Sequence, residues 1–141
     1  MADEASDFAR SMSIATSGLR AQAGRMRVIS ENFANAESTA PTAGGDPYRR
    51  KVPTFSSALD RTLDAKVVTL GKVRPDQSAF RVKYEPSNPA SDVAGNVKYP
   101  NVNPLVEMTD MREAQRSYEA NLNIISATRR MIQRTLDILK A

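Results

Sequence analysis

The side chains best suited to catalysis are largely missing from this chain. Its 141 residues include neither cysteine nor histidine, which excludes disulfides, thiolate metal sites and the commonest general base. Asp60 and Asp64 could share one helix face, but nothing near them suggests an acid–base pair, and a solvated face explains them better. Gly44-Gly45 lacks the spacing and the lysine of a phosphate-binding loop. We therefore expect no enzyme, no metal and no cofactor.

The charge of the chain points to no polyanionic partner. The net charge is +4 and the sequence pI about 9.6, with most of the excess in the middle of the chain. The densest basic cluster, Arg49-Arg50-Lys51, is too short to form a binding stripe, so we expect no nucleic acid. The first residues are acidic rather than basic, and no apolar core follows, so we expect no cleaved signal peptide. No run of about 18 apolar residues occurs, so we expect no membrane insertion.

Both ends of the chain have the pattern of long helices. All eight prolines fall between Pro41 and Pro104, and on either side apolar residues recur at alternating spacings of four and three. This spacing keeps one apolar seam along a helix and is the pattern of coiled coils. In the N-terminal segment the seam comprises Phe8, Met12, Ala15, Leu19, Gln22, Met26, Ile29 and Phe33; in the C-terminal segment, Met111, Gln115, Tyr118, Leu122, Ile125, Arg129, Ile132, Leu136 and Leu139.

These patterns predict a mainly α fold: long N- and C-terminal helices packed as an antiparallel coiled coil, with a small β-hairpin and loops between them. The first helix should run from Ser6 or Asp7 to about Ala36. The second should be capped by Asn103, begin at Pro104 and end near Lys140. The predicted domains are residues 1–36 with 105–141, which form the helical part, and the proline-rich segment 37–104.

Each predicted helix carries a second apolar line beside its seam, and a two-helix hairpin would leave these lines exposed. They comprise Ile14, Ala21 and Val28 in the first helix, and Ile124, Met131 and Ile138 in the second. Exposed apolar surface of this kind indicates an interaction site. The alternative is that the middle segment folds back and covers it.

The middle segment contains two predicted strands. Phe80, Val82 and Tyr84 alternate with charged residues, which is the period of a half-buried strand. Residues 66–73 are the expected partner, joined to it through the turn-forming residues 75–78. A segment of this size cannot form a large core of its own.

Several motifs resemble those of bacterial flagellar rod and hook proteins. Asn32-Phe33-Ala34-Asn35-Ala36 resembles the signature that ends the N-terminal helix in this family, Tyr48-Arg49-Arg50 resembles the motif that follows, and Arg116-Ser117-Tyr118-Glu119-Ala120-Asn121 resembles a C-terminal motif. One branch of the family forms the proximal rod. The motif that selects this branch comprises Tyr84, Glu85, Pro86, Asn88 and Pro89, followed by Pro100-Asn101-Val102.

The resemblance implies a structural subunit that stacks helically into a hollow drive shaft, transmits torque and conducts exported subunits. It implies three kinds of rod partner beside further copies: other proximal rod proteins, distal rod proteins and the adaptor that joins the rod to the membrane ring. The implied location is the basal body, in the rod that spans the periplasm. The implied route is the flagellar type III export gate, without a cleaved signal peptide. The expected assembly interface consists of Met12, Leu19, Met26, Ile29, Phe33, Tyr118, Leu122, Ile125, Ile132 and Leu136.

Phe55 and Leu59 resemble the export element of early rod and hook subunits. We expect them one turn apart on a short helix, as a compact apolar pair for the export gate. The alternative is that both residues pack under the middle segment.

Two other classes of function remain open at this point. A soluble helical-hairpin adaptor or export chaperone would also carry exposed apolar helix faces, and a nucleic-acid or membrane-surface binder would also be basic.

Overall fold

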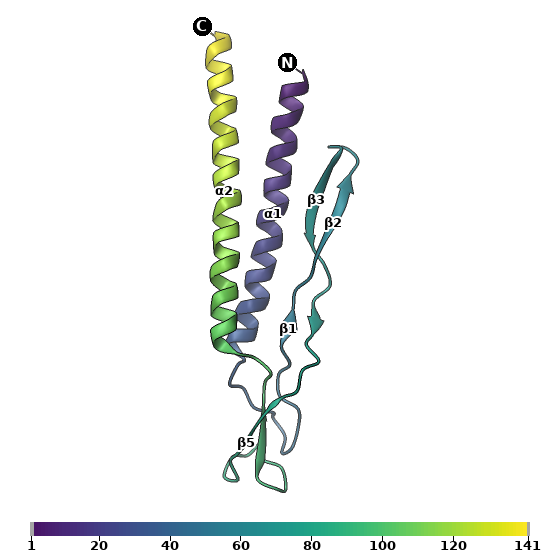
Figure 1. Cartoon of the computed structure of the whole chain (residues 1–141), viewed down its shortest axis with the longest axis vertical. Helices are drawn as coiled ribbons and strands as arrows, with labels where there is room; N and C mark the ends of the chain where they lie inside the picture. Colours follow the sequence, from purple (N-terminus) through teal and green to yellow (C-terminus); the bar gives the residue numbers. More distant parts are fainter. Residues whose placement is uncertain (1, 141) are drawn as a thin grey trace. The chain divides into compact units, whose positions relative to one another are not determined.

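The computed structural model describes residues 2–140, with side chains from Ser6 to Lys140. Two long helices lie at the ends of the chain and six short strands between them (Figure 1). The elements are α1 (Ala2–Ala34), β1 (Lys51–Val52), β2 (Phe55–Asp60), β3 (Ala65–Leu70), β4 (Arg74–Pro75), β5 (Arg81–Tyr84), β6 (Asn96–Tyr99) and α2 (Pro104–Lys140). The prediction of two terminal helices around a small β segment is confirmed.

The start of α2 follows from its capping residues. The Asn103 side-chain oxygen accepts the backbone N–H of Leu105 at 3.1 Å, and its carbonyl accepts that of Glu107 at 3.1 Å. Pro104 occupies the first helical position, where its missing N–H leaves no bond unmade. The predicted cap and start of this helix are both confirmed.

The strands form three separate two-stranded antiparallel ladders: β1 with β4, β2 with β3, and β5 with β6. The prediction that residues 66–73 pair with the strand around Val82 is wrong. Strand β3 instead pairs with β2, where Phe55 lies opposite Leu70. Strand β5 pairs with β6, where Tyr84 lies opposite Asn96.

The contacts divide the chain into two compact units. Unit 1 contains the chain up to Arg25, Thr54–Lys72, and the chain from Glu113 onward; unit 2 contains Met26–Pro53 and Val73–Arg112. Each helix contributes to both units.

In unit 1, α1 and α2 lie side by side and run in opposite directions (Figure 1). Arg25 pairs with Glu113 at 3.2 Å, and Gly18 lies so close to Asn121 that an added Cβ would come within 2.8 Å of its side-chain oxygen. The absence of a side chain at Gly18 therefore allows the close approach of α2.

The β2–β3 hairpin of unit 1 lies along α1. Ser17 Oγ accepts the backbone N–H of Val68 at 3.2 Å, and Arg10 Nε donates to the carbonyl of Leu63 at 2.8 Å. A Cβ added at Gly24 would come within 2.6 Å of Leu70 Cδ2. A groove of about 650 Å³ between hairpin and helix is lined by Ala9, Met12, Ala21, Val67 and Leu70, among others.

The second apolar lines of the two helices therefore differ in exposure. In α1, Ala21 is 2% exposed and Val28 is 7% exposed, because segments of the middle region cover them, whereas Ile14 remains 42% exposed. In α2, Ile124, Met131 and Ile138 remain 45%, 48% and 76% exposed. The alternative of a middle segment that folds back therefore holds for Ala21 and Val28, and the expectation of exposed apolar surface holds for Ile14 and for the line on α2.

The side of α2 that is buried differs from the predicted seam. Ala114 is fully buried and Thr128 is 2% exposed, whereas the predicted seam residues Leu122 and Leu136 are 42% and 45% exposed. Tyr118, Ile125 and Ile132, which alternate along the predicted seam, are half-buried as expected. At the positions between them, the less exposed residue lies one position earlier: Ala114 and Thr128 are buried, whereas Gln115 and Arg129 are exposed. The expectation that Leu122 is buried is wrong, because short side chains let the helices approach more closely than leucine would.

Unit 2 has a small core around β6. Val97 is fully buried, and Tyr99 and Ala90 are 8% and 5% exposed. Val82 and Tyr84 of β5 point away from this core and are 60% and 70% exposed. The prediction that their face of the strand is the half-buried one is therefore wrong.

The other face of β5 carries Arg81 and Lys83, whose partly exposed side chains contact neighbouring groups. Arg81 donates to the carbonyls of Ala36 and Pro100 at 2.8 and 3.1 Å, and Lys83 lies 4.7 Å from the centroid of the Tyr99 ring.

Candidate functional site

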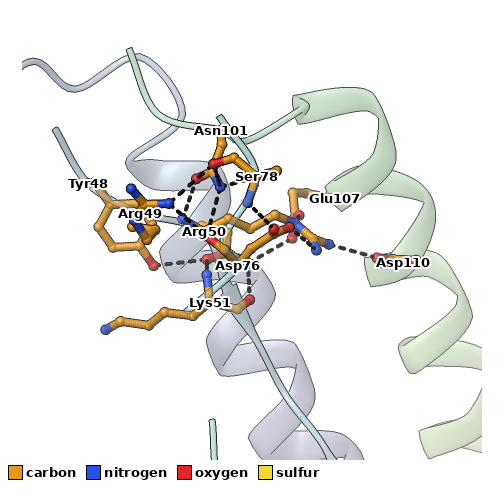
Figure 2. Close-up of polar contacts among 10 residues, drawn as sticks. Tyr48, Arg49, Arg50, Lys51, Asp76, Ser78, Asn101, Glu107 and Asp110 are labelled. Carbon is orange, nitrogen blue, oxygen red and sulfur yellow. Dashed lines mark hydrogen bonds and ion pairs between the residues drawn. The ribbon is translucent and has the colours of Figure 1, made fainter. Parts of the chain in front are cut away.

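The most distinctive feature of unit 2 is a polar cluster at the end of α1 and the start of α2, which we name the Arg50–Glu107 cluster (Figure 2). It brings together four stretches of chain: the last turn of α1, the segment before and within β1, the turn after β4, and the residues from Asn101 into the first turns of α2. Its members are Asn32, Tyr48, Arg49, Arg50, Lys51, Asp76, Ser78, Asn101, Glu107 and Asp110.

Glu107 is the buried charge at the centre of the cluster. Its side chain is 0% exposed. Arg50 Nε donates to its Oε1 at 2.6 Å, and Asn32 Nδ2 donates to its Oε2 at 3.2 Å. Since a buried carboxylate is tolerated only when it is paired and hydrogen-bonded, these two donors are what allow Glu107 to lie here.

Asn32 uses all of its hydrogen-bonding capacity. It is 1% exposed, and besides Glu107 its amide donates to the carbonyl of Lys51 at 2.8 Å. Its oxygen accepts the Tyr48 hydroxyl and the Lys51 backbone N–H, both at 2.9 Å. One amide side chain thus connects α1 to the middle segment and to α2.

Among the side chains that the structure describes, from Ser6 to Lys140, Arg50 is the only cation that forms an ion pair with Glu107. The same guanidinium lies 3.6 Å from a carboxylate oxygen of Asp76 and 3.6 Å from one of Asp110. Burial works to lower the pKa of Arg50, but its hydrogen bond to Glu107 and the nearby carboxylates outweigh burial and raise it. The cation is therefore permanent.

The turn after β4 closes the cluster. Asn101 Oδ1 accepts the Arg50 backbone N–H at 2.8 Å, and its amide donates to the carbonyls of Asp76 and Ser78 at 3.1 and 3.2 Å. Hydrogen bonds from Ser78, together with the Arg50 charge, lower the pKa of Asp76. Arg49 donates to the same two carbonyls and stacks 4.2 Å from the centroid of the Phe80 ring.

Burial also affects the ionisation of the Tyr48 hydroxyl. Loss of solvation raises the pKa of Tyr48 to about 12, and the charges of Glu31 and Glu107 act in the same direction. The hydroxyl therefore stays protonated and keeps donating to Asn32.

A second motif builds the loop between β5 and β6. Glu85 accepts the Tyr99 hydroxyl at 2.8 Å and the Asn88 amide at 3.1 Å, and these bonds lower the pKa of Glu85. Gly95 has a positive φ of 82°, which glycine adopts without strain, and a Cβ there would come within 2.8 Å of the Tyr84 ring. These hydrogen bonds and the turn at Gly95 fix the shape of the loop.

The predicted interface residues differ in exposure. Phe33, Leu122 and Leu136 are exposed, at 47%, 42% and 45%. The others are buried or half-buried within the chain: Ile29, Met12, Leu19, Met26, Tyr118, Ile125 and Ile132.

Most of the predicted motif residues meet in unit 2. Asn32, Tyr48, Arg49 and Arg50 lie in the cluster, and Tyr84, Glu85, Pro86, Asn88 and Pro89 form or flank the β5–β6 loop. Asn35 donates to the carbonyl of Glu31 at 2.8 Å, at the end of α1. Asn121 lies in unit 1, opposite Gly18.

Phe55 and Leu59 lie on strand β2, so the expectation that they occupy a short helix is wrong. They are 44% and 58% exposed. Residues four apart on a strand face the same side about 13 Å apart, so both still lie on one face. The alternative, in which both residues are packed under the middle segment, does not hold for the folded chain.

Sequence reasoning missed the role of Glu107. The helix dipole favours a carboxylate near the start of α2, and an exposed carboxylate would satisfy it equally well. The predicted seam continues back from Met111 to Met108, which is 45% exposed, so the pattern did not mark Glu107; Glu107 instead lies seven residues before Ala114, on the line of α2 that is buried. An acidic residue on this buried line requires a cation, and Arg50 supplies it.

Comparison with known proteins identifies the family. The chain is 53% identical to the flagellar basal-body rod protein FlgC of Agrobacterium fabrum, over 91% of this chain and 92% of that protein. It is 37% identical to the FlgC protein of Bacillus subtilis, over 92% of this chain and 97% of that protein. The chain belongs to the FlgC family of flagellar basal-body rod proteins. Residues 93–138 also match the family profile "Flagellar basal body rod FlgEFG protein C-terminal".

Membership of the FlgC family confirms the resemblance seen in the motifs. It is a family of structural rod proteins rather than enzymes. Within residues 2–140, no helix is both long and apolar enough to cross a membrane.

Proposed function

We propose that this protein is a structural subunit of the proximal rod in the bacterial flagellar basal body. The observation that carries the proposal is 53% identity to an FlgC protein over 91% of the chain. The Arg50–Glu107 cluster supports it, because the motif residues that resemble this family join both terminal helices to the middle segment. The rod would act as a hollow shaft that transmits torque and conducts exported subunits.

In the rod, residues 1–36 with 105–141 would form the helical assembly domain, packed as an antiparallel coiled coil, and 37–104 the connecting segment. The predicted interface residues then act in two places. The buried and half-buried ones, such as Ile29 and Ile125, hold the helices of one subunit together. The exposed ones, Phe33, Leu122 and Leu136, contact neighbouring copies or other proximal rod, distal rod and ring-adaptor proteins. The exposed line containing Met131 extends this surface.

The subunit would reach a periplasm-spanning rod through the flagellar type III export gate, without a cleaved signal peptide. Phe55 and Leu59 are the proposed docking pair. Their exposure on one face of β2 supports this proposal, since an extended apolar pair can bind a groove by strand addition.

Isolation of basal bodies tests the main proposal. In cells that carry a tagged copy in place of the native chain, the protein should co-purify with detergent-resistant basal bodies. A chain found only in the cytosol would instead support an adaptor or chaperone, and a chain released by salt would support a surface binder.

The export proposal has a separate test. In cells that export subunits but cannot assemble a rod, Phe55→Ala should accumulate in the cytoplasm, whereas the neighbouring exposed change Ser57→Ala should be secreted like the wild type. Normal secretion of Phe55→Ala would end the export proposal and leave the rod proposal intact.

A further inference from the structure

We propose that Glu107 and Asn32 set the register between the end of α1 and the start of α2, and that Arg50 makes this register depend on the middle segment. The inference concerns the folding of one chain, so it does not depend on assembly into a rod.

The register of two paired helices can be set by apolar packing or by a buried polar contact. The deeply buried apolar residues of the two helices include Ala15, Ala21, Val28, Ile29 and Ala114. Apolar contacts are non-directional, so a slipped pair can replace part of them with other apolar contacts. A single buried polar contact is the best-attested means of selecting one register in paired helices.

The Asn32–Glu107 contact can form in only one register. Counting one turn, or about four residues, along each antiparallel helix gives the two nearest alternatives. In one, Asn32 faces Met111, and Glu107 lies past Ala34, the last residue of α1, level with Ala36. In the other, Glu107 faces Val28. Either slip leaves the carboxylate against apolar side chains, and both Ala36 and Val28 are buried, at 3% and 7% exposed.

Arg50 adds a condition to this selection. The cation that neutralises Glu107 comes from neither helix but from the segment before β1, which Asn32 itself holds through Lys51 and Tyr48. Helices that pair before this segment docks would bury an uncompensated carboxylate. The native register is therefore stable only when α1, α2 and the middle segment meet together.

The absence of cysteine from the chain allows a direct test by disulfide trapping in the purified full-length protein. Gly18→Cys with Asn121→Cys reports the native register, because these residues are in contact. Gly18→Cys with Ser117→Cys, and Gly18→Cys with Ile125→Cys, report slips of one turn in either direction. Both slip reporters also carry Asn121→Ser, so that the Gly18→Cys side chain has equal room in all three.

In the otherwise wild-type chain, the native reporter should cross-link about ten-fold or more faster than either slip reporter. Arg50→Met with Glu107→Leu removes the charges while keeping the volume, and the three rates should then approach one another. Glu107→Gln keeps a hydrogen-bonding partner for Asn32 and should retain the native preference. Tyr99→Phe, which removes a hydrogen bond of unit 2 away from the helices, should retain it as well.

An unchanged native preference in the Arg50→Met/Glu107→Leu chain would overturn the proposal and assign the register to packing. If circular dichroism shows that this variant is unfolded, Asn32→Asp takes its place. That change keeps the side-chain shape but sets a second carboxylate against Glu107, so the native cross-link should be lost. Its persistence would equally overturn the proposal.

Discussion

Removal of the cation beside Glu107 should destabilise unit 2 strongly. In Arg50→Met, the fully buried carboxylate of Glu107 loses a donor at 2.6 Å and keeps only the Asn32 amide. Breaking a buried ion pair by removing one partner costs about 3–5 kcal/mol, because the remaining charge stays buried and uncompensated. Asp76 and Asp110 also lose their ion pairs with Arg50, but their side chains are 28% and 32% exposed, so water can solvate them instead. Their loss adds at most about 1 kcal/mol to the destabilisation.

We therefore expect Arg50→Met to lower the free energy of unfolding by about 3–4 kcal/mol at neutral pH, which corresponds to a fall in Tm of roughly 10 °C. Urea unfolding followed by tyrosine fluorescence measures this change where it occurs, since Tyr48, Tyr84 and Tyr99 belong to unit 2. Lys51→Met is the matched control: Lys51 pairs with Glu31, both side chains are 41% exposed, and the loss should stay below about 1 kcal/mol.

The double variant Arg50→Met/Glu107→Leu separates pairing from packing. Replacing both charges by apolar groups of similar volume should restore stability to within about 1 kcal/mol of the wild type. The reasoning is refuted if Arg50→Met unfolds like the Lys51→Met control, because Glu107 would then be hydrated. It is also refuted if the double variant is as unstable as Arg50→Met alone.

Three further predictions concern titration and assembly. One tyrosine, Tyr48, should ionise only near pH 12 in an absorbance titration; because the native pKa is raised, its contribution to stability is complete below about pH 10 and is lost as the pH rises through 12. Tyr99→Phe should raise the pKa of the Glu85 carboxyl in an NMR titration, since the tyrosine hydroxyl is the main cause of its lowered value. In the wild type, the stabilisation from this bond is present above the ordinary carboxyl range and is lost as the pH falls through the native pKa of Glu85. An unchanged pKa of Glu85 in the variant would contradict the bond. Leu122→Asp should leave the free chain within about 0.5 kcal/mol of wild type yet abolish motility, whereas the half-buried Ile125→Asp should also destabilise the free chain; swimming cells with Leu122→Asp would remove that residue from the assembly interface.

The local sequence determined the elements whose causes are local. The cap at Asn103 with Pro104 behind it is enough to start α2, because the bonds that satisfy the first turn come from these residues themselves. The absence of cysteine and histidine, and the family motifs, likewise needed no structure to be informative.

Tertiary structure decided which sides of these elements are buried. The heptad pattern of α2 is consistent with two neighbouring phases, and close approach of α1 at Gly18 selected the one with Ala114 and Thr128 rather than Leu122. The same holds for β5, where the alternation predicts that Val82 and Tyr84 are half-buried, yet both are exposed and Arg81 is the side chain that bonds to the carbonyls of Ala36 and Pro100. The burial of Glu107 follows from the same cause: a carboxylate on a helix is acceptable in water or beside a cation, and only the fold brings Arg50, 57 residues away in sequence, to meet it.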